Sequence, residues 1–336
     1  MNRRLGVRLG LAVLALVGIA EQRASADQIF YYTNFGGALP QQGSIQSVDI
    51  TTNTTTTIVS GLTTPDSLIF SSPNTILFSQ TNTSGQSNSG TVNQVNINGT
   101  GNTPVASGLS FPEDMALDPG GQSVVVADSN NNRVIRINLT THVVTPLATF
   151  GSAVRGVAYD AAGHLFVNVD SSQTTGSIVE INPLTGAVIK TLTLPSAGDG
   201  LTYDPSTGTL WAASISNTGI IRIANNLSSA TEFDCTSSNG TVCGQYDGLE
   251  ASGNGFVDLA NTAGYIDQYN IASGTFSFVI AAPNIDDLAP IVGLGAPPPV
   301  TPTPEPASAL LLATGVFALF LLRKRAFAKP ASVSQL

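Results

Sequence analysis

A sequence repeat with a period of about 40 to 48 residues runs through most of this chain and constrains its fold more than any other feature. Each repeat opens with a short apolar segment that carries a charged residue near its start, in most cases aspartate. The six opening segments are residues 65–70, 112–117, 154–159, 198–203, 246–251 and 285–290. Periods of this length are typical of propellers and solenoids, in which each repeat is one supersecondary unit.

Further strand-like segments follow each opening segment. A turn such as 118–121 leads to a second apolar run, 123–127, because Asp caps its own backbone and Gly accepts a positive φ. Third segments with alternating apolar and polar residues follow at 133–137, 177–181, 219–223 and 265–269. This alternation indicates strands with one buried face. Turns at 182–186 and 270–274 then lead to a fourth strand, and four strands per repeat predict the blades of a β-propeller.

The two ends of the repeat region interleave. The first recognisable strand, 29–32, aligns with a second strand of the repeat, whereas the sixth opening segment lies near the far end at 285–290. We therefore expect one blade to combine strands from both termini, which closes the ring and protects the sheet edges at that point. The predicted fold is an all-β, six-bladed β-propeller over residues 27–295.

The segment 112–137 resembles an NHL repeat, and the region 28–295 is more distantly similar to the gluconolactonase and regucalcin-like propellers. In those propellers the residue before Gly-Leu of the first strand faces the central channel, so the resemblance implies that five carboxylates converge with Arg155 as the single cation. These candidate metal ligands are Asp66, Glu113, Asp199, Asp247 and Asp286. Because such carboxylates repel one another, we expect Ca²⁺ or a similar hard divalent cation among them. The alternative is that each Asp bonds nearby backbone N–H groups while Arg155 neutralises two neighbours.

The same resemblance offers an enzymatic alternative, a metal-dependent lactonase or hydrolase that polarises an ester carbonyl or activates water. The related enzymes have an Asn among their metal ligands, whereas this chain has Asp, Glu or Arg at all six positions, a departure that weighs against catalysis. We expect His142 on an outer strand and His164 in a turn, where they have no reason to meet in a Ser-His-Asp triad. No catalytic residue is assigned, and a non-catalytic module is the preferred interpretation.

The first 26 residues have the features of a signal peptide. Three arginines precede an apolar run at 9–20, and Ala24 and Ala26 are the small residues that a signal peptidase requires. We expect a signal helix over 1–26 and a mature chain that begins near Asp27.

The C-terminal residues combine a Pro-rich linker (296–306) with a hydrophobic segment and basic stop (307–325), for which we expect a transmembrane helix. The motif residues are Pro304, Glu305, Pro306, Arg323, Lys324 and Arg325. Their order resembles the PEP-CTERM signal of Gram-negative bacteria, and this resemblance implies an exosortase-type protease that cuts near the Pro-Glu-Pro motif. The alternative is an ordinary single-span anchor. Both interpretations place the protein outside the cytoplasm, first as an inner-membrane-anchored precursor.

Between the two targeting segments the chain is acidic and rich in Thr, Ser, Asn and Gly. Five Lys and Arg stand against twenty Asp and Glu, which gives a formal charge of −15 for this part. We therefore expect no binding to nucleic acid or to an anionic membrane surface.

Cys235 and Cys243 are the two cysteines of the chain, and in an oxidising compartment their close spacing predicts a local disulfide. The loop between them and the connections 34–43 and 81–90 are candidate binding surfaces. The sequence thus predicts an exported scaffold or binding protein of the periplasm, cell surface or extracellular matrix, with a glycan or a protein as its ligand.

Overall fold

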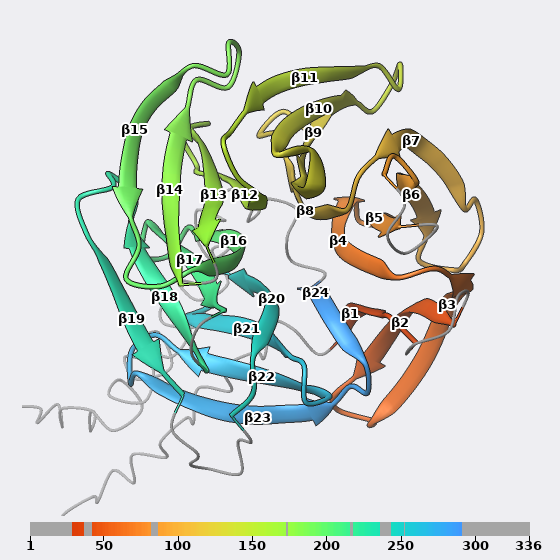
Figure 1. Cartoon of the computed structure of the whole chain (residues 1–336). Helices are drawn as coiled ribbons and strands as arrows, with labels where there is room; N and C mark the ends of the chain where they lie inside the picture. Colours follow the sequence, from red (N-terminus) through yellow and green to blue (C-terminus); the bar gives the residue numbers. More distant parts are fainter. Residues whose placement is uncertain are drawn as a thin grey trace, which may run out of the picture. The chain divides into compact units, whose positions relative to one another are not determined.

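Twenty-four strands form six antiparallel sheets of four strands, arranged as blades around a central channel (Figure 1). The computed structural model describes residues 29–36, 42–81, 87–172, 174–215, 218–235, 243–251 and 253–290. The predicted signal peptide, linker and C-terminal hydrophobic segment lie outside these ranges. In the described part of the chain, no helix has the length and apolar character needed to cross a bilayer.

Each blade is numbered here by its order in the sequence and given from its innermost to its outermost strand. Blade 1 contains β24 (Ile285–Pro290), β1 (Ile29–Asn34), β2 (Gly43–Asp49) and β3 (Thr54–Leu62). Blade 2 contains β4 (Pro65–Ser72), β5 (Thr75–Thr81), β6 (Gly90–Asn96) and β7 (Thr103–Leu109). Blade 3 contains β8 (Pro112–Leu117), β9 (Ser123–Asp128), β10 (Arg133–Asn138) and β11 (Val144–Thr149).

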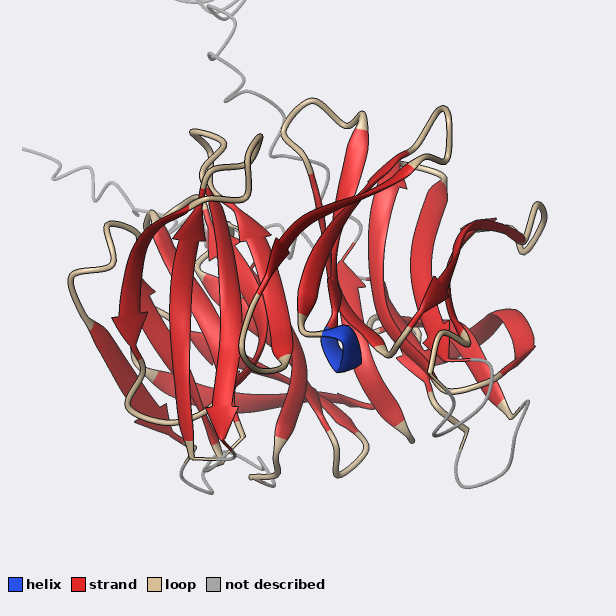
Figure 2. Cartoon of the chain, turned by 45° about the horizontal axis from the view of Figure 1, so that its top comes forward, coloured by secondary structure: helices blue, strands red, loops and turns tan. Residues whose placement is uncertain are grey.

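The remaining three blades follow the same order. Blade 4 contains β12 (Val154–Tyr159), β13 (Leu165–Ser172), β14 (Thr175–Ile181) and β15 (Val188–Thr193). Blade 5 contains β16 (Gly198–Asp204), β17 (Thr209–Ser214), β18 (Gly219–Ala224) and β19 (Ala230–Asp234). Blade 6 contains β20 (Tyr246–Ala251), β21 (Phe256–Asn261), β22 (Tyr265–Asn270) and β23 (Thr275–Ala281). One short 3₁₀ turn, η1 (Ser129–Asn131), joins β9 to β10 (Figure 2).

Ring closure occurs inside blade 1, where the C-terminal strand β24 pairs with the N-terminal strand β1. The register is antiparallel, with Tyr31 opposite Ala289 and Tyr32 opposite Leu288. This confirms the prediction that one blade combines strands from both ends of the repeat region. The prediction of an all-β, six-bladed propeller is confirmed with it.

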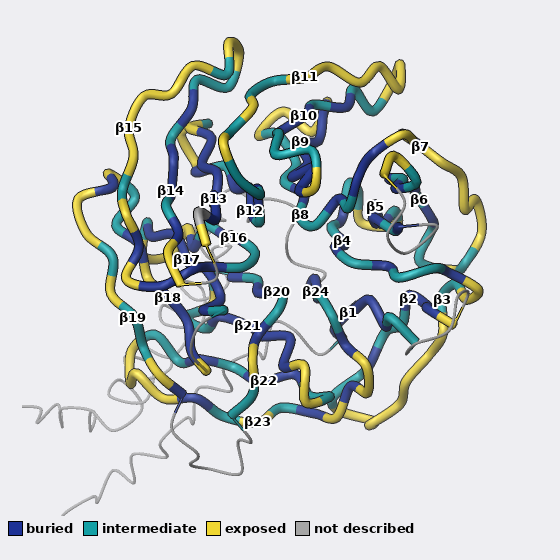
Figure 3. The backbone as a smooth tube through the Cα atoms, viewed as in Figure 1, coloured by how far each residue is buried: buried dark blue, intermediate teal, exposed yellow. Residues whose placement is uncertain are grey.

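The hydrophobic core consists of six clusters, one between each pair of adjacent blades. The central strands of each blade bury both faces, because a blade has a neighbour on either side. Along β9, Val124 and Val126 pack toward blade 2, whereas Val125 and Ala127 pack toward blade 4. The outermost strands are the most exposed parts of the blades (Figure 3).

The two histidines take ordinary positions in turns. His164 lies between β12 and β13, as predicted. The prediction that His142 lies on an outer strand is wrong, because His142 precedes β11 in a turn and has a φ of 58°. Asn138 stabilises that turn, since its side-chain oxygen accepts hydrogen bonds from the backbone N–H groups of Thr140 and Thr141.

Candidate functional site: an acidic central channel

The innermost strand of every blade has an irregular register at the charged residue near its start or, in blade 5, directly after it. In blade 3 the pairing with β9 shifts between Pro112 and Asp114, and corresponding shifts occur in the other five blades. A β-bulge leaves a residue out of the ladder and redirects its side chain. The six bulges therefore turn one or two side chains per blade toward the channel.

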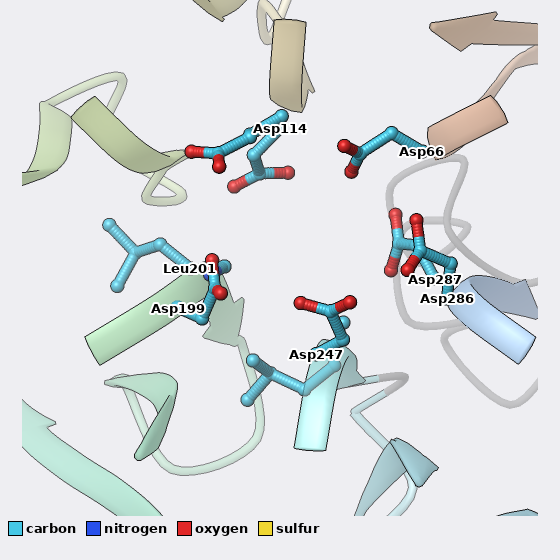
Figure 4. Close-up of a pocket in the computed structure, with 11 residues that line it drawn as sticks. Asp66, Asp114, Asp199, Leu201, Asp247, Asp286 and Asp287 are labelled. Carbon is cyan, nitrogen blue, oxygen red and sulfur yellow. The ribbon is translucent and has the colours of Figure 1, made fainter. Parts of the chain in front are cut away.

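The five candidate ligands that the sequence identified all line one cavity in this channel. Asp66, Glu113, Asp199, Asp247 and Asp286 come from five different blades. Arg155 stands at the equivalent position of β12 in blade 4. The close-up shows the labelled carboxylates directed toward a common central space (Figure 4).

Two further carboxylates of the cavity were not identified from the sequence. Asp114 and Asp287 immediately follow Glu113 and Asp286, and they line the same cavity. The equivalent position holds Ser67 in blade 2 and glycine in blades 4, 5 and 6. The acidic pairs Glu113-Asp114 and Asp286-Asp287 were the available signal, because a bulge can direct two successive side chains away from the sheet.

Each of these two carboxylates connects its blade to the next one. Asp114 accepts hydrogen bonds from the backbone N–H of Met115 at 2.7 Å and of Val157, in blade 4, at 2.8 Å. Asp287 accepts hydrogen bonds from the N–H of Leu288 at 2.8 Å and of Leu68, in blade 2, at 3.1 Å. The alternative to a bound cation was that aspartates of the channel accept hydrogen bonds from nearby backbone N–H groups. Asp114 and Asp287 have such partners.

The cavity enclosed by these side chains is small. Its volume is about 20 Å³, which is room for about one water molecule. Sites for small organic molecules usually enclose about 300 to 1,000 Å³. The channel at this point can hold a water molecule or a single ion, and a sugar ring does not fit.

Burial and mutual repulsion raise the pKa values of several channel carboxyls. Burial, followed by the charges of other channel acids, raises the pKa of Asp66 well above its ordinary value. The same two causes, in the same order, act on the pKa of Asp199 and of Asp286. Burial raises the pKa of Glu113 to about 7, against the lowering effect of Arg155. Burial also raises the pKa of Asp287 to about 7.

A carboxyl pair spans blades 6 and 1. The raised pKa of Asp286 comes first from burial, then from the charge of Asp247 and from a side-chain hydrogen bond between the two residues. Two carboxylates cannot hydrogen bond to each other unless one of them carries a proton. Asp286 therefore keeps its proton to a higher pH than an exposed aspartate does, which removes part of the repulsion in the channel.

Arg155 neutralises one wall of the channel. Its guanidinium forms an ion pair with Glu113 of blade 3, and its Nε lies 3.4 Å from Oδ2 of Asp170 in its own blade. The charges of Glu113, Asp199 and Asp170 raise the pKa of Arg155 against the effect of burial. The sequence-based alternative expected two ring neighbours as partners, whereas Asp170 lies on β13, outside the six equivalent positions.

The ligand atoms in the channel are of the type that a hard cation prefers, but their arrangement does not suit one. Carboxylate oxygens are the ligands that Ca²⁺ prefers. Within the described ranges, however, no group of three or more His, Cys, Asp or Glu side chains is arranged so that it could hold a metal ion. Arg155 and backbone N–H groups stabilise part of the carboxylate charge in the arrangement seen here. A cation would therefore have to draw the carboxylates closer together.

The predicted disulfide between Cys235 and Cys243 is present, and it bridges the connection from β19 to β20. The start of each inner strand lies opposite the end of the second strand, as for Pro65 with Gln80 and Pro112 with Asp128. The connections 34–43, 81–90 and 235–243 consequently begin and end at the same end of the channel as the acidic ring. Residues 37–41, 82–86 and 236–242 of these connections lie outside the described residues, as do Ala24, Ala26 and the C-terminal sorting motif.

Comparison with solved structures agrees with this architecture. A chain in the crystal structure of the nidogen/laminin complex superposes with a TM-score of 0.61, at 13% identity, over 77% of this chain and 97% of its own length. The protein of this sequence is a six-bladed β-propeller. TolB from Acinetobacter baumannii is similar to this propeller with a TM-score of 0.55, also at 13% identity, over 75% of this chain and 67% of TolB. The sequence of the propeller matches no protein-family model and no curated protein. At this identity the similarity concerns the fold alone.

Proposed function

We propose that this chain is an exported β-propeller that acts as a non-catalytic binding or scaffold module. In this proposal the N-terminal segment directs export, and an exosortase-type protease processes the PEP-CTERM-like tail near Pro304-Glu305-Pro306. The ectodomain then resides in the periplasm, at the cell surface or in the extracellular matrix of a Gram-negative bacterium, where it binds a glycan or a protein.

The observation that carries the proposal is the combination of a rigid ring of blades with a channel cavity of about 20 Å³. A cavity of this size cannot admit a lactone or a sugar, which argues against the lactonase alternative. In this proposal the ligand binds at the surface of the propeller, where connecting loops on a scaffold of blades commonly carry recognition. The nidogen/laminin complex is an example of a similar fold in a structure with a protein partner.

Two measurements test this function. Mass spectrometry of the mature protein should place one cut after Ala26 and another near Pro304, and intact termini would contradict the proposed processing. The purified ectodomain should be retained on a column of at least one bacterial exopolysaccharide, or on a matrix protein, without turnover of the ligand. Hydrolysis of lactones by the same preparation would overturn the non-catalytic assignment.

A divalent cation in the channel remains the sequence-based hypothesis for neutralising the carboxylates. The supporting observation is the convergence of seven carboxylates on one cavity. Chelation followed by addition of Ca²⁺ should raise the melting temperature of the wild-type protein, and Asp247→Asn should reduce that rise. The matched control is Asp49→Asn, which changes an exposed carboxylate on β2. An unchanged melting temperature on chelation and resupply would exclude the cation.

A further inference from the structure

Strand β24 differs from the other innermost strands, because no turn of the chain connects it directly to the second strand of its blade. It follows β23 of blade 6 in the sequence, yet it pairs with β1 of blade 1. In each of the other five blades, the innermost strand precedes the second strand directly in the chain. The contacts between β24 and its neighbours therefore determine whether the ring is open or closed.

The ladder between β24 and β1 is interrupted at the bulge. Regular pairing runs from Phe30 opposite Pro290 to Tyr32 opposite Leu288, and it then shifts before Asn34 pairs with Ile285. A bulge leaves backbone groups of the extra residue without their ladder partners. A hydroxyl at this point can replace the missing partners.

Thr33 supplies this hydroxyl. Its Oγ1 accepts a hydrogen bond from the backbone N–H of Asp287 at 2.9 Å and donates one to the carbonyl oxygen of the same residue at 3.3 Å. The Thr33 side chain is fully buried, so neither bond can be replaced by bulk water. Beside it, Asn34 Nδ2 donates to the carbonyl of Pro283 at 2.7 Å, and the N–H of Phe35 donates to Asn284 at 3.1 Å.

The side chain of Asp287 extends the connection to two more blades. Its carboxylate accepts the N–H of Leu68 in blade 2. On the other side it lies against Gly248 of blade 6, where a Cβ atom would come within 1.8 Å of Oδ1. Any larger residue at position 248 would displace the carboxylate. Asp287 thus occupies the point at which blades 6, 1 and 2 meet.

We propose that Thr33 and Asp287 form a clasp that holds the C-terminal strand β24 in place and thereby closes the propeller ring. The clasp also assembles the acidic channel, because β24 contributes Asp286 and Asp287 to the cavity. When the clasp is open, the channel lacks both side chains. This proposal goes beyond the proposed function and does not depend on which ligand the propeller binds.

Asp114 provides an internal comparison. It makes the same kind of contacts, to the N–H of Met115 and to that of Val157 in the next blade. Its strand, β8, is however joined directly to β9 by a turn within blade 3. Loss of the Asp114 contacts should loosen the junction between blades 3 and 4 without releasing a strand.

Amide hydrogen exchange of the full chain tests the clasp. Thr33→Val removes the hydroxyl and keeps the shape of the side chain. Asp287→Asn replaces one acceptor oxygen by a donor that cannot pair with an N–H. Each variant should accelerate exchange in β24, in β1 and at the Leu68 N–H by about tenfold, because a buried donor has lost its acceptor. Exchange in β9 and β17 should stay unchanged, and Asp114→Asn should act at Met115 of β8 and on β12 alone.

Equal acceleration in all six blades, or none in β24, would overturn the proposal. If the variants do not fold, the wild-type protein still provides a test under mildly destabilising conditions. Under these conditions the Leu68 N–H should exchange at the same rate as the amides of β24. It should exchange faster than the Val157 N–H, which donates a hydrogen bond to Asp114. Slower exchange at Leu68 than in β24 would overturn the clasp. Failure of glycan or protein binding would leave these exchange rates unaffected.

Discussion

The acidic residues at the starts of the inner strands differ in their surroundings, although they occupy equivalent places in the repeat. Glu113 is paired with Arg155, whereas burial and the charge of Asp247 raise the pKa of Asp286. Asp114 is satisfied by backbone N–H groups of two blades. Acidic residues at similar places can therefore form an ion pair, take a raised pKa or connect two blades, depending on the groups that surround them.

The raised pKa values predict an unusual pH dependence of stability at the residue scale. Because the pKa of Glu113 and of Asp287 is about 7 in the folded protein and near 4 when unfolded, the folded state binds more protons between these values. Stability should then fall as the pH rises from about 4 through about 7. In the presence of a chelator, the melting temperature should be higher at pH 5 than at pH 8.

A matched pair of variants separates this effect from general acid sensitivity. Glu113→Gln removes one titrating group and should flatten the decrease between pH 5 and pH 8. Asp49→Asn should leave it unchanged, because Asp49 is exposed and hydrogen bonds from Thr51 and Thr52 lower its pKa. A wild-type melting temperature that rises over this pH range would contradict the prediction.

At the scale of the strand, burial follows the position within the blade. The second and third strands lie between two neighbouring sheets and supply most of the core clusters, such as Val124 to Ala127 on β9 and Ile135 on β10. The fourth strands form the rim, where Val188 and Ile189 of β15 are 61% and 57% exposed. The same apolar residue type therefore contributes differently to stability on different strands.

Truncation of isoleucine on two strands tests this distinction. Ile135→Ala leaves a void between blades 2 and 3 and should lower the free energy of unfolding by about 2 to 5 kcal/mol. Ile189→Ala removes a side chain that is mostly in water and should change it by about 0.5 kcal/mol or less. Urea denaturation measures the free energy of unfolding of both variants. Similar losses would show that the apolar clusters between blades are not the main core.

At the scale of the whole molecule, stability depends on closing the ring. Each blade packs against two neighbours, and the six clusters between blades form a continuous circle only when blade 1 is complete. Blade 1 is complete only when β24 has joined β1. The last described strand of the chain is thus required for contacts that involve the first one.

Two truncated chains test this dependence. A chain of residues 27–295 keeps every described strand, whereas a chain of residues 27–284 lacks β24. The longer chain should melt in one cooperative transition by circular dichroism. The shorter one should melt at a markedly lower temperature or without a sharp transition, because Leu288 and Ile285 leave the cluster between blades 6 and 1. Identical transitions would mean that β24 is dispensable for closure.

Much of the fold was predictable from the sequence because each repeat carries its own local signals. The turns, the alternating strands and the charged residue at each inner strand recur at a similar spacing. The resemblance to the gluconolactonase-like propellers then assigned Asp66, Glu113, Asp199, Asp247 and Asp286 to the channel. Thr33, Asp170 and Asp287 could not be assigned their roles. Each acts on a partner that only the folded ring brings near. No local pattern distinguishes Thr33 and Asp170 from other polar residues on strands, and the acidic pair Asp286-Asp287 indicates a channel position without naming its partners.

The sequence by itself determined the number of blades, the four strands expected per blade and the interleaved ends, since these follow from periodicity and turn chemistry within a few dozen residues. The tertiary structure alone decided the surroundings of the channel acids. Glu113 pairs with Arg155, burial and the charge of Asp247 raise the pKa of Asp286, and Asp287 accepts the N–H of Leu68 in the next blade. The physical reason is that the two kinds of interaction act between different kinds of neighbours. Strand formation responds to neighbouring residues in the chain, whereas protonation and hydrogen bonding in the channel depend on side chains that closure brings within a few ångströms.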